Sequence, residues 1–136
     1  MKDVAKIAVQ WWIDQLSIRN NILKDDSTNA ISVSYHRRFD EEYPDNYSYL
    51  NWKVGNIAEK DLKLFEKLLI QEITLKIEQH KNMILGAAIN AYGILKDVAE
   101  QSNIDINVFP IYTAMVIFDG KIEVSEGFYK PFKLIA

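Results

Sequence analysis

Hydrophobic positions near the N-terminus recur with the period of a helix. Between Asp3 and Asn20 the spacing is close to i, i+3, i+4, i+7. The residues of this apolar stripe are Val4, Ile7, Ala8, Trp11, Trp12 and Leu16. Asp3 is a good N-cap residue, and the pair Asn20-Asn21 is suited to end a helix. The pattern predicts a helix over residues 3–20 with one buried face.

The next part of the chain loses the helical period. Residues 25–29 are Asp-Asp-Ser-Thr-Asn, which favour turns because their short side chains compete for backbone hydrogen bonds. Apolar and polar residues then alternate over residues 31–36, as in a half-exposed strand. Residues 35–52 are rich in aromatic and charged side chains without a sustained period. We expect a loop at 25–29, a strand at 31–36 and a long ordered loop after it.

A second helical pattern begins after Asn56. Asn56 and Glu59 have the spacing of a capping box. The apolar stripe that follows consists of Leu62, Phe65, Leu69, Ile73 and Ile77. These features predict a helix from about 57 to 80. His80 falls in its last turn, where a cationic side chain favours the negative end of the helix dipole.

Residues 83–103 allow two interpretations, a second long helix or a strand and a helix separated at Gly93. Glycine costs a helix interior about 1 kcal/mol relative to alanine, and residues 85–92 alternate in a strand-like way. We therefore predict a strand near 84–92 and a helix over 94–102 that buries Leu95, Val98 and Ala99. Asn103 would end this helix in the left-handed conformation.

The clearest local signal is Asp119-Gly120 between two strand-like segments, 111–118 and 121–125. Asp-Gly supplies the positive φ values of a two-residue type I′ hairpin turn. This register pairs Ile117 with Ile122 and Met115 with Val124 on one face, and leaves the other face of the second strand half solvated. A short terminal strand is expected around Phe132, Leu134 and Ile135.

Together these elements predict an α+β fold in which residues 1–136 form a single domain. The expected order is α, β, α, β, α, β, β. Two or three helices would pack on one face of a mostly antiparallel sheet of three to four strands.

Composition removes several classes of function. The 136 residues carry a net charge of -3, which disfavours nucleic-acid binding over a broad basic face. The absence of cysteine excludes disulfides, thiolate nucleophiles and Cys-ligated metals. No apolar run approaches the length of a membrane span, and no secretory signal is visible. We expect a cytoplasmic protein with no cofactor and no association with membranes.

Catalytic motifs are also missing from the sequence. The glycines do not have the spacing of a P-loop or a dinucleotide fingerprint, and no serine lies in a G-x-S-x-G elbow. Acidic residues that could hold Mg²⁺ or Ca²⁺ lie at Asp25, Asp26, Asp40, Glu41, Glu42 and Asp45. They lack the spacing of a calcium loop, so a solvated face is favoured over a metal site. We assign no catalytic and no metal-binding residue.

One cluster combines arginine with aromatic side chains. Its members are Tyr35, His36, Arg37, Arg38, Tyr43, Tyr47 and Tyr49. Arginine and tyrosine are enriched at protein-binding hot spots, and the same residue types bind small ligands or unstacked bases. Alternatively, the tyrosines cover the core and the arginines pair with the neighbouring acidic residues. The pair Trp11-Trp12 poses a similar choice, between core packing and a homodimer or partner interface.

The C-terminal third carries a recognisable series of positions. They read I-L-x-x-x-A from Ile94, then Ile104, then F-P-x-x-T-x-M from Phe109, then G-x-I-x-V from Gly120, then G-x-x-x-P from Gly127. With the Trp-Trp pair, this series resembles small uncharacterised proteins of phages, plasmids and genomic islands of low-GC Gram-positive bacteria. The resemblance covers residues 94–136 and loosely the first helix, but not residues 21–56. It implies a fold and a genomic setting, and it transfers no catalytic residue.

From these observations we expect a non-enzymatic cytoplasmic protein that binds another protein as an accessory factor of a mobile element. The alternative is a small hydrolytic or metal-assisted enzyme that uses His36 with Asp40, Glu41 or Glu42. A third class, binding of single-stranded nucleic acid, predicts affinity that falls steeply with added salt.

Overall fold

The structure is a computed structural model, and it describes residues 3–24, 54–127 and 130–136. Within these residues the chain forms three α-helices, a five-stranded antiparallel sheet and a two-stranded parallel sheet. The helices are α1 (Val4–Arg19), α4 (Glu59–Glu78) and α5 (Gly93–Gln101), with a 3₁₀ turn η1 (Ile106–Val108). The strands are β1 (Asn21–Leu23), β2 (Asn56–Ala58), β3 (Met83–Ala87), β4 (Ala91–Tyr92), β5 (Thr113–Phe118), β6 (Lys121–Glu126) and β7 (Lys133–Leu134).

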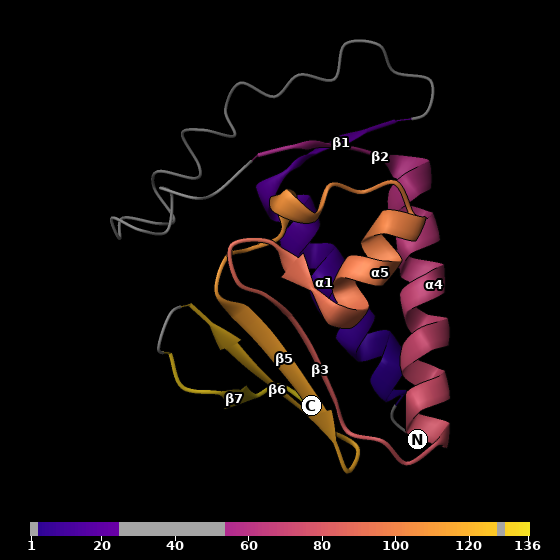
Figure 1. The fold of residues 1–136 in the computed structure, drawn as a ribbon, viewed down its shortest axis with the longest axis vertical. Coiled ribbons are helices and arrows are strands. Elements are labelled where there is room, and N and C mark those ends of the chain that lie inside the picture. The colour runs from indigo at the N-terminus through magenta and orange to yellow at the C-terminus, as the bar shows by residue number, and fades with distance from the viewer. Residues whose placement is uncertain (1–2, 25–53, 128–129) are drawn as a thin grey trace.

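The predicted α+β class is confirmed. The antiparallel sheet, called the main sheet below, has the order β4-β3-β5-β6-β7. It has five described strands rather than three to four, because two-residue strands are added at both edges. Figure 1 shows α1, α4 and α5 packed together on one side of this sheet. None of the described helices is both long and apolar enough to cross a membrane.

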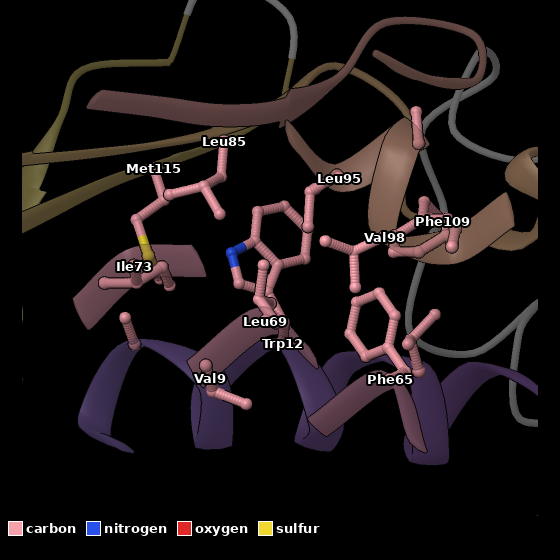
Figure 2. Close-up of a cluster of buried hydrophobic side chains, with 14 of the residues drawn as sticks. Val9, Trp12, Phe65, Leu69, Ile73, Leu85, Leu95, Val98, Phe109 and Met115 are labelled. Carbon is pink, nitrogen blue, oxygen red and sulfur yellow. The ribbon is translucent and has the colours of Figure 1, made fainter. Parts of the chain in front are cut away.

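The core lies between the helices and the inner face of the main sheet. Trp12 is at its centre, between Leu85 and Met115 of the sheet and Leu69 of α4 (Figure 2). Phe65 and Phe109 continue the core, with their ring centroids 5.8 Å apart. Burial of these large apolar side chains supplies the main driving force for docking the helices on the sheet.

The two predicted long helices are present. Asp3 caps α1 by accepting a hydrogen bond of 3.2 Å from the backbone N–H of Lys6. The predicted capping box of α4 is wrong, because Asn56 belongs to β2 and Ala58 is the N-cap residue. The Asn56 side chain accepts a hydrogen bond of 3.0 Å from Asn21 instead. Pairing with β1 therefore takes precedence over local capping at this position.

The division at Gly93 is also confirmed, since α5 begins there with a φ of 58°. The predicted strand 84–92 is instead an antiparallel pair, β3 and β4, joined by a turn at residues 88–90. The backbone N–H of Ala88 donates to the carbonyl of Asn90 across this turn at 3.1 Å. The alternating pattern continued through the turn, so it did not reveal the reversal of the chain.

The C-terminal hairpin has the predicted register. Ile117 pairs with Ile122 and Met115 with Val124, and all four side chains are buried on the inner face. Asp119 and Gly120 have φ values of 48° and 73°, as a type I′ turn requires. The expected terminal strand is present as β7, which pairs with β6.

Candidate functional site

The two faces of the main sheet differ in what covers them. The inner face packs against the helices, whereas no described helix covers the opposite face, called the outer face below. Directly paired residues of neighbouring strands share a face, so the pairings assign the side chains of the outer face. These side chains are Ile84, Tyr92, Ala114, Val116, Phe118, Lys121, Glu123, Ser125 and Leu134.

The outer face is unusually apolar for a sheet exposed to water. Ile84 is 56% exposed, Tyr92 42% and Leu134 61%. On β5, the central strand, all three outer positions are apolar, namely Ala114, Val116 and Phe118. A sheet with one solvated face normally alternates apolar and polar residues, whereas strands covered on both faces are apolar throughout. The composition of β5 is therefore typical of a strand covered on both faces.

Gly86 and Tyr92 shape one end of this surface. They are paired residues of β3 and β4, and the Tyr92 ring lies over Gly86. A Cβ atom at Gly86 would overlap the Tyr92 hydroxyl and lie 2.8 Å from its Cζ. Glycine thus allows the tyrosine ring to lie flat on the sheet, where it presents an aromatic surface with a polar end.

Charged side chains lie at one side of the apolar surface. On β6, Lys121 is paired with Phe118 and Glu123 with Val116. Within the described residues, neither charge makes an ion pair. The outer face therefore combines an apolar centre with one positive and one negative charge on the same neighbouring strand.

The tyrosine and arginine cluster predicted from sequence, residues 35–49, lies outside the described residues, as do the predicted loop 25–29 and strand 31–36. His36, Asp40, Glu41 and Glu42, proposed for the alternative enzyme, lie there too. The structure does describe the two points where this segment joins the fold. The segment leaves after β1 and returns before β2, and these strands are parallel neighbours.

Asn20 holds the two ends of that segment together. Its Oδ1 accepts a hydrogen bond of 2.8 Å from the backbone N–H of Gly55. Its Nδ2 donates to the carbonyls of Leu16 at 3.0 Å and Val108 at 3.2 Å. The backbone N–H of Asn21 also donates to the carbonyl of Gly55 at 2.9 Å. This buried side chain thus joins α1, the start of β2 and η1.

The tryptophan pair is divided between core and surface. Trp12 is fully buried, and its Nε1 has no hydrogen-bond partner among the described residues, so its contribution is packing. Trp11 is half-buried and meets Trp12 edge to face, with ring centroids 4.9 Å apart. Core packing therefore accounts for Trp12, and only Trp11 offers part of its ring to a partner.

The surroundings of His80 and the acidic residues bear on catalysis and metal binding in the described part of the chain. His80 lines a pocket of about 180 Å³ together with Asp119, Lys81 and Asn82. None of these side chains hydrogen bonds to His80, so no described acid–base pair is formed. Among the described residues, no group of three His, Asp or Glu side chains is arranged to hold a metal ion.

Comparison with known proteins adds no family assignment. No protein-family model matches the chain, and no curated protein matches it. The similarity to mobile-element proteins of low-GC Gram-positive bacteria stays a prediction from the sequence.

Only some of the residues on the outer face can be predicted from the sequence. The hairpin register predicts that Ala114, Val116 and Phe118 share a face with Lys121, Glu123 and Ser125, and the structure confirms this pairing. Ile84 joins this face through the pairing of β3 with β5, which are distant in the sequence. Tyr92 and Leu134 join it through the two-residue edge strands β4 and β7, which are too short to give an alternating pattern. The available signal was the run of apolar residues over 114–118, which is typical of a strand covered on both faces.

Proposed function

We propose that the chain is a non-enzymatic protein-binding module that acts through the outer face of its main sheet. The observation that supports this most strongly is that Ala114, Val116 and Phe118, the three outer positions of β5, are all apolar on a face that no described helix covers. Contiguous apolar patches on a soluble domain commonly mark interaction sites. Ile84, Tyr92 and Phe118 supply the large apolar and aromatic contacts on which protein interfaces depend.

We infer from the resemblance over residues 94–136 that this module is an accessory factor of a bacterial mobile element and works in the cytoplasm. The enzyme based on His36 with Asp40, Glu41 or Glu42 stays a sequence prediction, because its residues lie outside the described ranges.

Site-specific photo-crosslinking tests the binding role. A photoreactive amino acid is placed at Ile84 of the full chain, in cells that express the protein naturally. We expect a covalent adduct with a protein, identified by mass spectrometry, because the 56% exposed side chain would face the bound partner. The matched control carries the same photoreactive residue at Lys96, an exposed position of α5 away from the outer face.

An adduct formed from position 84 and not from position 96 supports the proposal. Absence of any protein adduct at position 84, in a chain that melts like the unmodified protein, contradicts it.

A further inference from the structure

We propose that the partner of the outer face is a second copy of this chain, packed face to face about a two-fold axis. This inference rests on the binding role proposed above and names the occupant of that same surface. The axis lies between the two outer faces and runs perpendicular to the strands. Along the strand direction, it is placed midway between Lys121 and Glu123.

The positions of the charges along β6 support this arrangement. Lys121 is paired with Phe118, and these two residues lie at the same level along the strand direction. Glu123, two residues further along β6, is paired with Val116 and lies at the next level. Two residues of a strand span about 7 Å. Next to the Asp119-Gly120 turn, the outer face therefore has two adjacent levels, one with a positive charge beside Phe118 and one with a negative charge beside Val116. A third level, with Ala114, Ser125 and Tyr92, follows on the side away from the turn.

A two-fold axis perpendicular to the strands exchanges these two levels. It places Lys121 opposite the partner's Glu123, and Glu123 opposite the partner's Lys121. The same rotation places Phe118 over the partner's Val116, so apolar side chains meet apolar side chains. One symmetry operation thus satisfies the charged and the apolar residues of these two levels, as a self-complementary interface requires. The third level, with Ala114 and Tyr92, then lies opposite the turn of the second copy.

Other placements of the two-fold axis do not bring opposite charges together and apolar side chains together at the same time. An axis parallel to the strands keeps each level opposite itself, so a charge meets either a like charge or an apolar side chain. An axis at the height of Glu123 brings the two Glu123 carboxylates together. Desolvated like charges at an interface cost several kcal/mol, so these arrangements are disfavoured.

The size of the surface predicts a reversible dimer. The three inner strands, β3, β5 and β6, have five or six residues, and the two edge strands have two residues each. Five strands about 4.8 Å apart and at most about 20 Å long therefore give a footprint below about 400 Å². Stable interfaces commonly bury about 800 Å² per partner, so this footprint belongs with weak associations. The equilibrium should therefore depend strongly on protein concentration.

Sedimentation velocity of the full chain, from about 10 µM to about 1 mM at low salt, tests the proposal. We expect the wild type to shift from monomer to dimer over this range. Glu123→Lys or Lys121→Glu alone should raise the dimer Kd at least about tenfold, because each sets like charges against each other. The double exchange Lys121→Glu with Glu123→Lys should restore the Kd to within about threefold of wild type.

Lys96→Glu serves as the matched control, since it reverses an exposed charge outside the face and should leave the Kd unchanged. Melting temperatures of all variants establish that each chain is folded. A wild type that stays monomeric throughout overturns the inference, as does a folded double variant that fails to dimerise. Single variants that dimerise like the wild type overturn it as well.

The result separates this inference from the proposed function. A monomeric wild type that still forms an adduct from position 84 with a different protein contradicts only the identity of the partner. Absence of any adduct at position 84 contradicts the binding role of the face itself.

Discussion

Two residues with positive φ determine where α4 and α5 end. His80 has a φ of 57° and Asn103 a φ of 62°. After α4, the backbone N–H of Lys81 donates to the carbonyl of Lys76 at 3.0 Å, and that of His80 to Ile77 at 2.9 Å. These two bonds are those of a Schellman motif. Ile104 and Asn103 make the equivalent bonds to Ala99 and Glu100 after α5.

The sequence predicted this conformation for Asn103 but not for His80. Asparagine tolerates the left-handed region, so an Asn followed by an apolar residue indicates a helix end. The sequence places His80 in the last turn of a helix predicted to extend to about residue 80, whereas the helix ends at Glu78 and His80 adopts the left-handed conformation beyond it.

Replacing His80 by glycine should therefore stabilise the protein. Glycine adopts positive φ without the steric cost of a Cβ, so we expect His80→Gly to raise the free energy of unfolding by about 0.5–1 kcal/mol. Urea denaturation measures the change. Gln71→Gly, at an exposed position within α4, should instead lower stability by a similar amount. A loss of stability in His80→Gly would contradict the conformation assigned to this residue.

The cluster at residues 35–49 leads to a second prediction at the residue scale. If Arg37, Arg38 and Tyr47 belong to a protein-binding surface, their joint replacement by alanine should abolish partner binding and leave the melting temperature nearly unchanged. Binding is measured by capture of the partner from cell lysate, and stability by thermal denaturation. A large drop in melting temperature would instead show that these side chains stabilise the fold.

At the scale of elements, the parallel pair β1 and β2 is the feature that the sequence did not predict. Each strand has three residues, too few to produce an alternating pattern, and the paired positions are 35 residues apart. By contrast, the β5–β6 register follows from the Asp119-Gly120 turn alone. The turn between β3 and β4 lacks glycine and proline, so it gave no comparable signal.

Asn20 should be a major determinant of stability at this junction. Asn20→Ala removes an acceptor for Gly55 and a donor for two carbonyls within a buried environment. Buried polar groups left without partners cost about 1–3 kcal/mol, so we expect a loss of roughly 2–3 kcal/mol. Chemical denaturation compares this variant with Asn56→Ala, whose exposed side chain should contribute less than about 1 kcal/mol. Equal effects of the two replacements would contradict the role assigned to Asn20.

At the scale of the whole molecule, the two faces of the main sheet differ in burial, and the functional interpretation rests on this difference. The helices and the inner face form a complete core, with Trp12, Phe65 and Phe109 almost fully buried. The outer face adds little to this core but retains apolar side chains on three strands. The sequence predicted the fold class because helix and hairpin signals are local. The full set of outer-face residues could not be predicted from the sequence, because the tertiary fold determines which strands are neighbours in the sheet.

Val116→Lys tests the central claim most directly, because it places a charge at the middle of the outer face without entering the core. We predict that the melting temperature stays within about 4 °C of wild type, since Val116 is only half-buried. The photo-crosslinked adduct from position 84 should disappear in the same variant, because a lysine would be desolvated in the interface. An undiminished adduct in the folded Val116→Lys protein would contradict the assignment of the outer face as the binding surface.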